Sequence, residues 1–154
     1  MMSLQSEVLR LLRGRTLVTA ESITGGGIGA ALTAVPGSSA VYKGGIISYC
    51  DDVKASVLGV SRELLREKGA VSAPVAEAMA EGARRILDAD MAVSVTGLAG
   101  PDADSYGNSV GTVFIGYADG QETVSRMFLF CGDRDAVRAQ TVSSALELIL
   151  EKNS

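Results

Sequence analysis

The segment from Thr16 to Val35 constrains the fold most, because its residue pattern changes twice over a short length. Its first part, Thr16–Glu21, has the apolar and β-branched residues of a short strand. Three consecutive glycines, Gly25–Gly27, then open a stretch rich in Ala and Leu, which Pro36-Gly37 stops. Strand, glycine turn and helix in this order are typical of α/β proteins, and we predict that fold class for this chain.

The same alternation continues through the rest of the sequence. Further strands are expected at Gly45–Cys50, Met91–Thr96, Thr112–Ala118 and Thr123–Phe130, and further helices at Leu4–Leu12, Asp51–Leu58, Arg62–Lys68, Ser72–Leu87 and from Asp133 onward. Asp119-Gly120 is a strong hairpin signal and predicts at least one antiparallel strand pair. No repeat and no low-complexity linker divides the sequence. We therefore expect a single domain over residues 1–154, with a mixed sheet covered on both faces.

Composition excludes several classes of function. The 154 residues, 47% of them hydrophobic, are enough to bury a core without a disulfide or a metal. The 14 basic residues are scattered and the 18 acidic residues outnumber them, so we expect no nucleic-acid groove. The sequence contains no histidine, which excludes Ser-His-Asp and Cys-His catalysis and metal sites built on histidine. A catalytic base must therefore be Lys, Asp, Glu, Tyr or Cys.

The two cysteines, Cys50 and Cys131, are too few for a thiolate metal site and form no CxxC pair. We expect both to be buried strand residues in a reducing compartment. The uncharged stretch Ser22–Tyr42 is interrupted by Gly, Ser, Thr and Pro, so no membrane span is expected, and the N-terminus lacks the core of a signal peptide. These features predict a soluble, cytoplasmic protein.

Small and polar residues follow three of the predicted strands, at the point where each strand ends. The three segments read AESITGG over 20–26, YCDDVK over 49–54 and TGLAGP over 96–101. In open α/β sheets, ligands usually bind beyond the carboxyl ends of the strands. The sequence therefore predicts a ligand site where these three segments meet.

Ser22 and Lys54 are the residues in these segments best suited to chemistry. Ser22 lies where a strand turns into a helix, whose unpaired N–H groups and dipole favour an oxyanion. Lys54, near a helix N-terminus in a partly desolvated cleft, is expected to have a lowered pKa and to deprotonate a serine. Tyr49 can relay the proton or orient the lysine. The alternatives are a purely structural glycine turn and a solvated or ion-paired lysine.

Several blocks of the sequence carry a family resemblance that covers roughly residues 5 to 150. They are AESITGG, PGSSAVYKGGIISY followed by DDVK, GAVSAPVAEAMAEGA, VSVTGLAGP, VGTVFIGYA and GDRDAVRAQTV. Together they resemble the CinA C-terminal domain family. This resemblance implies a stand-alone three-layer α/β/α domain that needs no cofactor and no metal. It also implies hydrolysis of the carboxamide of nicotinamide mononucleotide, which gives nicotinate mononucleotide and ammonia.

The resemblance assigns roles to individual residues. It implies that Ser22 is the nucleophile, Lys54 the base and Tyr49 the assisting residue. The implied substrate-binding residues are Glu21, Thr24, Gly25, Gly26, Thr96, Gly97, Ala99 and Arg138, with Arg134 as the alternative to Arg138. Either arginine lies near the start of the final helix, where its guanidinium could pair with the substrate phosphate or form a surface ion pair.

The loop after Gly100-Pro101 departs from the family pattern. Where the family is usually glycine-rich, this chain has Asp102 and Asp104, and two carboxylates near a phosphate would repel it. We expect both to face solvent. Ile23, where Cys or Leu is frequent in the family, is a milder departure.

Two other functions remain open at the level of sequence. The domain could be a non-catalytic interaction or regulatory module on the same scaffold, linked to competence or to the DNA-damage response. It could also be an amidase for a different carboxamide. From the resemblance and from the apolar helices rich in Val and Ala, we expect a homodimer.

Overall fold

The computed structural model describes all residues from 1 to 154 and contains one five-stranded mixed sheet, with strand order β2-β1-β3-β4-β5. The strands are β1 (Leu17–Glu21), β2 (Tyr42–Ile47), β3 (Met91–Gly97), β4 (Thr112–Ala118) and β5 (Thr123–Leu129). β1 runs parallel to β2 and β3, whereas β4 is antiparallel to both β3 and β5. The carboxyl ends of β1, β2 and β3 therefore meet at one edge of the sheet.

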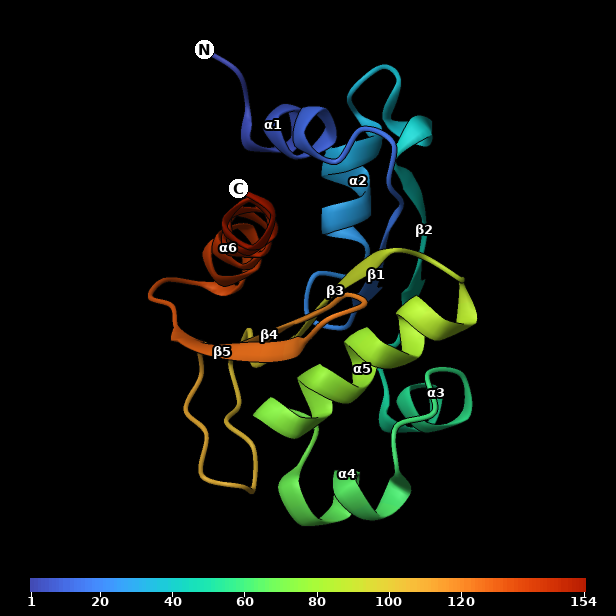
Figure 1. The fold of residues 1–154 in the computed structure, drawn as a ribbon. Coiled ribbons are helices and arrows are strands. Elements are labelled where there is room, and N and C mark those ends of the chain that lie inside the picture. Colours follow the sequence, from blue (N-terminus) through green and yellow to red (C-terminus); the bar gives the residue numbers. More distant parts are fainter.

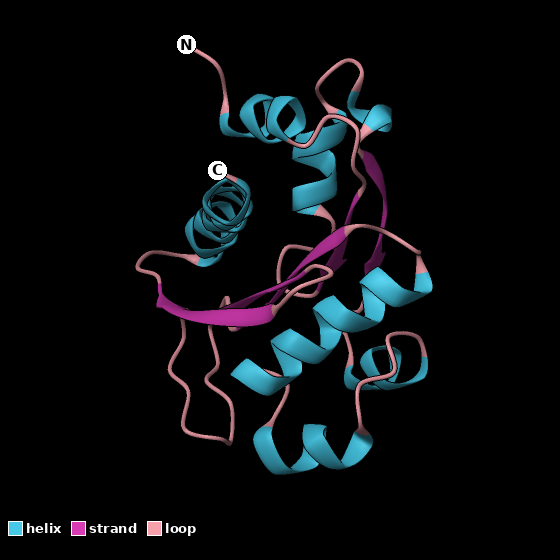
Figure 2. Ribbon diagram, in the orientation of Figure 1, coloured by secondary structure: helices cyan, strands magenta, loops and turns pink.

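Helices cover both faces of this sheet and make three layers (Figures 1 and 2). The helices are α1 (Leu4–Leu11), α2 (Gly27–Thr33), α3 (Asp51–Ser56), α4 (Arg62–Lys68), α5 (Ala73–Ile86) and α6 (Arg134–Asn153), with a short 3-10 turn at Ser38–Ala40. On one face α1, α2 and α6 share a core with strand residues such as Leu17 and Ile115. On the other face α3, α4 and α5 pack on residues such as Val18 and Ala92. The predicted α/β class and mixed sheet are confirmed.

Small residues of the sheet, Ser94 and Gly116, face helix α5 and contact its backbone. Gly116 of β4 leaves no room for a Cβ, which would lie 2.5 Å from the carbonyl oxygen of Ala76. The buried Ser94 of β3 donates a hydrogen bond of 2.5 Å to that same oxygen. A larger residue at position 116 would therefore push the helix away from the sheet.

Three helices begin at a residue whose side chain caps the first turn. The side chains of Ser3, Ser61 and Asp133 accept hydrogen bonds from the backbone N–H groups of Ser6, Leu64 and Ala136. At α3, however, the N-cap is Cys50, whose side chain makes no capping bond, and Asp51 and Asp52 lie in the first turn.

Two predictions about the second strand and the cysteines were wrong. The strand spans Tyr42–Ile47 rather than Gly45–Cys50, because it pairs with β1 only as far as Glu21. Both cysteines are exposed rather than buried in strands, since Cys50 lies just beyond the end of β2 and Cys131 lies in the connection to α6. A residue just beyond the end of a strand can follow apolar residues in the sequence and still lie outside the core.

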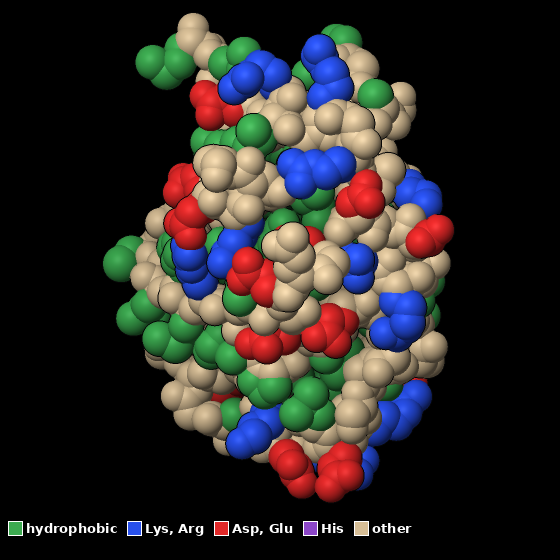
Figure 3. All heavy atoms as spheres, in the orientation of Figure 1, with side chains coloured by type: hydrophobic (Ala, Val, Ile, Leu, Met, Phe, Trp, Pro, Cys, Tyr) green, Lys and Arg blue, Asp and Glu red, His purple; other side chains and the backbone are tan.

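The surface carries charges of both signs. On the face shown in Figure 3, basic and acidic side chains are interspersed over α1, the sheet edge and α4. No helix in the structure is both long enough and apolar enough to cross a membrane.

Candidate active site

A cavity of about 240 Å³ lies at the carboxyl ends of β1, β2 and β3. Its lining residues come from all three strand ends and from two further segments, the α4–α5 connection and the start of α6. They are Ser22, Ile23, Tyr49, Asp51, Lys54, Ala70, Val71, Thr96, Gly97, Leu98, Ala99 and Arg134. Segments that are far apart in the sequence therefore form one recess, as the three polar strand ends predicted.

The structure brings Ser22 and Lys54 together in this cavity. The Nζ of Lys54 lies 3.1 Å from the Oγ of Ser22 and 2.9 Å from the carbonyl oxygen of Ser48. Lys54 is only 1% exposed, and no carboxylate forms an ion pair with it. Burial lowers the pKa of Lys54, although the charges of Asp51 and Cys50 partly oppose this effect. A buried amine of this kind is suited to accept the proton of a serine hydroxyl.

Glu21 supports the Ser22 turn from behind and does not line the cavity. Its two carboxylate oxygens accept four hydrogen bonds of 2.7 to 3.0 Å, from the hydroxyls of Thr19 and Thr24 and the backbone N–H groups of Ile28 and Gly29. The N-cap of α2 is Gly26, which has no side chain to cap the helix. Glu21 therefore accepts hydrogen bonds from the free backbone N–H groups in the first turn of α2, and it fixes the direction in which the chain leaves β1.

Tyr49 and Arg134 meet at the mouth of the cavity. The Arg134 guanidinium donates one hydrogen bond of 2.9 Å to the Tyr49 hydroxyl and one of 2.8 Å to the carbonyl oxygen of Gly100. It thus links the segments that follow β2 and β3. Tyr49 is 60% exposed. Its hydroxyl contacts Arg134 and forms no hydrogen bond with Ser22 or Lys54.

Arg138, one turn further along α6, has a different position. Its Nε and Nη2 donate hydrogen bonds of 3.1 Å to the carbonyl oxygens of Ile23 and Thr24. The guanidinium lies close to Gly25, whose φ of 60° lies in the left-handed region. Arg138 therefore holds the glycine turn, whereas Arg134 faces the cavity.

Comparison with known proteins identifies the family. The sequence profile of the CinA C-terminal domain matches residues 1–153. This chain belongs to that family.

Individual CinA relatives differ in length. The nicotinamide-nucleotide amidohydrolase PncC of Escherichia coli (strain K12) is 43% identical over 155 residues, which cover 99% of this chain and 94% of the relative. The CinA-like protein of Geobacter metallireducens is 47% identical over 147 residues, which cover 94% of this chain and 36% of the relative. This chain thus spans about a third of the length of that larger CinA-like protein.

Solved structures of the CinA superfamily share the fold. A protein from Klebsiella pneumoniae 700603 matches with a TM-score of 0.94 and 36% identity, covering 97% of this chain and 94% of that chain. The protein CihA from Agrobacterium tumefaciens matches with a TM-score of 0.90 and 37% identity, covering 99% and 98%. These matches confirm the three-layer α/β/α architecture.

The remaining residues assigned from the CinA resemblance divide into two groups. Thr96, Gly97 and Ala99 line the cavity, and Thr96 also donates a hydrogen bond of 2.9 Å to the carbonyl oxygen of Ala70. Thr24, Gly25 and Gly26 form the turn beside it without lining it. Gly97 has no room for a side chain, because a Cβ there would lie 2.7 Å from Val113.

The loop that departs from the CinA pattern turns away from the cavity. Asp102 is exposed, and the carboxylate of Asp104 accepts hydrogen bonds from the backbone N–H groups of Tyr106 and Asn108. The Tyr106 hydroxyl donates a 2.8 Å hydrogen bond to the carbonyl oxygen of Arg66 on α4. Neither carboxylate lines the cavity, so the added charges do not face a ligand there.

The sequence did not point to three residues of the candidate site. Ala70 and Val71, between α4 and α5, form part of the wall, and Ser48 supplies a carbonyl to Lys54. Strand pairing could have pointed to Ser48. Glu21 pairs with Ile47, and Ser22 and Ser48 are the residues that directly follow them. The contribution of Ala70 and Val71 left no local signal in the sequence.

Proposed function

We propose that this chain is an amidohydrolase that converts nicotinamide mononucleotide and water into nicotinate mononucleotide and ammonia. The observation that carries the proposal is the buried Lys54 amine, 3.1 Å from the Ser22 hydroxyl in a cavity at the strand ends. The E. coli relative, which this chain covers almost completely, is a nicotinamide-nucleotide amidohydrolase, and this supports the choice of substrate.

The first half of the reaction forms an acyl-enzyme. A neutral Lys54 amine accepts the Ser22 proton while it still donates to the Ser48 carbonyl oxygen. The Ser22 oxygen then attacks the carboxamide carbon and forms a tetrahedral intermediate. When this collapses, the C–N bond breaks and the leaving nitrogen takes the proton held by Lys54, so that ammonia departs.

The Ser22 turn also supplies candidate donors for the oxyanion. The backbone N–H groups of Ile23 and Thr24 have no acceptor within the protein. A donor aimed at a developing oxyanion commonly contributes about 2.7 to 4 kcal/mol to transition-state stabilisation. In the second half of the reaction, water adds to the acyl carbon, its proton passes to Lys54, and the Ser22 oxygen leaves with that proton to regenerate the hydroxyl.

Arg134 is the arginine that the cavity favours for the substrate phosphate. Its two acceptors, the Tyr49 hydroxyl and the Gly100 carbonyl, are neutral, and a phosphate binds a guanidinium more strongly than either. The sequence assigned this role first to Arg138, whose donors hold the glycine turn. Replacing Arg134 by Ala should therefore raise KM with little change in kcat, whereas replacing Arg138 should lower stability.

The test is ammonia release from nicotinamide mononucleotide by the purified protein. Ser22→Ala should lower the rate by at least about 10³-fold with the fold intact. Ser56→Ala, which removes an exposed hydroxyl on α3, is the matched control and should keep full activity. A protein that neither binds this nucleotide nor releases ammonia would favour the non-catalytic module, and activity only on other amides would favour a different carboxamide. The cytoplasmic location and the homodimer remain predictions, which cell fractionation and light scattering test.

A further inference from the structure

One buried hydroxyl in the molecule has no hydrogen-bonding partner. It is the Oγ of Ser48, a residue with no exposed surface, and no other buried side-chain nitrogen or oxygen is in this position. Buried polar groups are almost always paired, because an unpaired one loses its hydration without compensation. The exception lies one residue beyond the end of β2, next to the candidate active site.

The backbone of Ser48 already contacts both sides of this site. Its N–H donates a 2.8 Å hydrogen bond to the carbonyl oxygen of Glu21, and its own carbonyl oxygen accepts the 2.9 Å hydrogen bond from Lys54. The last pair of the β1–β2 register is Glu21 with Ile47, so Ser22 and Ser48 are the next residues along the two neighbouring chains. The Lys54 amine contacts both of them, at the Oγ of Ser22 and at the carbonyl oxygen of Ser48.

A count of donors shows what the Ser48 hydroxyl could bind. A lysine ammonium has three N–H donors, and Lys54 has two acceptors, the Ser22 Oγ and the Ser48 carbonyl oxygen. Covalent geometry keeps the Oγ of a serine within a few ångströms of its own carbonyl oxygen. One donor without an acceptor and one hydroxyl without a partner thus both lie close to the carbonyl oxygen of Ser48.

The other groups around Lys54 do not fill this role. The charged and titratable neighbours are Cys50 and Asp51 at the start of α3, and Tyr49 and Arg134 at the cavity mouth. None of them forms a hydrogen bond or an ion pair with the Lys54 amine. The wall from the α4–α5 connection, Ala70 and Val71, contributes no charged side chain.

We propose that Ser48 is a positioning residue whose hydroxyl rotates about χ1 to accept the third N–H of the Lys54 ammonium, formed when Lys54 takes the Ser22 proton. This inference rests on the proposed Ser22–Lys54 chemistry. The hydroxyl stays unpaired while the amine is neutral and becomes paired when the charge develops. The Ser48 hydroxyl therefore stabilises the Lys54 ammonium and the transition state in which that ammonium forms.

The test is Ser48→Ala, which separates this role from a structural one. Removing an unpaired buried hydroxyl should leave Tm unchanged or raise it. The Lys54 ammonium loses an acceptor, so its pKa should fall by about one pH unit, and kcat should fall about tenfold. Because the neutral amine is the active form, the acid limb of the kcat profile should move to lower pH. Ser48→Cys keeps the shape with a weak acceptor and should behave like the alanine variant.

The matched control is Ser94→Ala. This serine is equally buried, but its hydroxyl is paired with Ala76, so its removal should lower Tm and leave the pKa of Lys54 unchanged. The pKa of Lys54 is followed by an NMR titration of its Cε, which does not depend on turnover. An unchanged Lys54 pKa in Ser48→Ala, or a lower Tm with no pH effect, would overturn the inference. If the parent protein releases no ammonia, the proposed function fails, and the titration still decides the role of Ser48.

Discussion

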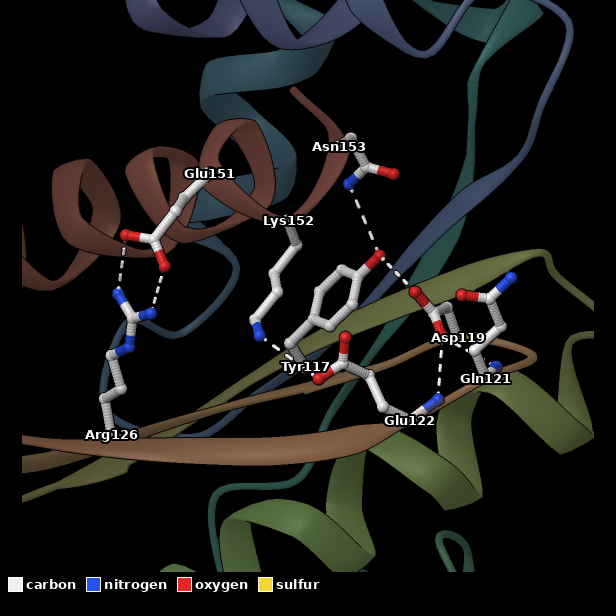
Figure 4. Close-up of polar contacts among 8 residues, drawn as sticks. All are labelled: Tyr117, Asp119, Gln121, Glu122, Arg126, Glu151, Lys152 and Asn153. Carbon is white, nitrogen blue, oxygen red and sulfur yellow. Dashed lines mark hydrogen bonds and ion pairs between the residues drawn. The ribbon is translucent and has the colours of Figure 1, made fainter.

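The two ends of the sheet differ in how completely their polar groups are paired. At the carboxyl ends of β1–β3, Lys54 is buried without a carboxylate and the Ser48 hydroxyl has no partner. At the opposite end, where β4 ends and α6 closes on the hairpin, nearly every group is matched (Figure 4). There Tyr117 donates to Asp119 and accepts from Asn153, Lys152 pairs with Glu122, and Arg126 pairs with Glu151.

This difference suggests a division of roles between the two ends. Burying an amine without a carboxylate partner opposes folding, so a fold retains such a group only where it is useful, and perturbed groups of this kind cluster at functional sites. At the opposite end, hydrogen bonds and ion pairs join helix α6 to the β4–β5 hairpin. Substitutions at the first end should therefore change activity more than stability, and substitutions at the second end should do the reverse.

The largest expected effect is that of Lys54→Met. We expect ammonia release to fall by about 10³-fold, as loss of a general base does. Burial holds the pKa of Lys54 below its ordinary 10.5, so the unfolded chain binds its proton more tightly than the folded chain. The stability of the parent protein should therefore rise as the pH increases toward 10.5. The variant should lack this rise and be more stable than the parent at neutral pH.

Urea denaturation at neutral and at alkaline pH checks the stability part of this prediction. A Lys54→Met protein that is less stable than its parent at neutral pH would mean that the amine contributes to folding. The comparison between the two ends would then lose its main support.

Glu21→Gln should have the next largest effect. Glu21 lies at the same end of the sheet as Lys54, but all its hydrogen bonds are formed, so this variant tests a paired group beside the candidate active site. An amide offers one acceptor oxygen where the carboxylate offers two, and its NH2 group faces donors. We expect the free energy of unfolding to fall by about 2 to 4 kcal/mol, with activity reduced as the Ser22 turn loosens. Chemical denaturation and kcat measure both effects. Unchanged stability with lost activity would instead indicate direct contact with the substrate.

Tyr117→Phe should lower stability by about 1 kcal/mol and leave ammonia release unchanged, because only the hydroxyl contacts are lost. Burial, together with the nearby Asp119, raises the pKa of Tyr117 from 10.0 to about 12. Between these values the folded chain keeps a proton that the unfolded chain loses, so the stability of the parent should fall as the pH rises above 10.0. The phenylalanine variant should show a smaller fall. A change in kcat would contradict the separation of the two ends.

Arg126→Gln should have the smallest effect. The pair with Glu151 is exposed, and such pairs contribute little because water screens them. The hydrogen bond from Arg126 lowers the pKa of Glu151, so any stabilisation is present above the ordinary glutamate pKa and is lost as the pH falls through the lowered value. The change in Tm should lie within the error of a thermal melt. A clear loss of Tm in low salt would show that even the exposed pairs of this end stabilise the fold.

Local patterns in the sequence predicted the helices and strands, except for the bounds of β2, and the position of the candidate site. The capping residues Ser3, Ser61 and Asp133 and the Asp119-Gly120 turn act over a few residues, so their signals can be read directly. The meeting of Ser22 and Lys54 followed from the rule that parallel strands end at a common edge.

Contacts between distant segments could not be predicted in the same way. The partner of Tyr49 is Arg134, 85 positions further along, and Arg138 reaches a carbonyl 115 positions back. Only the packing of α6 against the Ser22 turn decides which arginine faces the cavity. The cysteines were misjudged for a similar reason, since one residue more or less of strand pairing decides between core and surface.

Helix α6 physically connects the two ends compared above. Arg134 at its start contacts Tyr49 and Gly100, and Asn153 at its end contacts Tyr117. An α-helix is stiff over such a length, so it behaves as a strut rather than a hinge. A tilt of α6 that breaks the contacts of Arg134 at the cavity mouth would also change the contact of Asn153 with Tyr117. The position of Arg134 at the cavity mouth therefore depends on contacts at the other end of the helix.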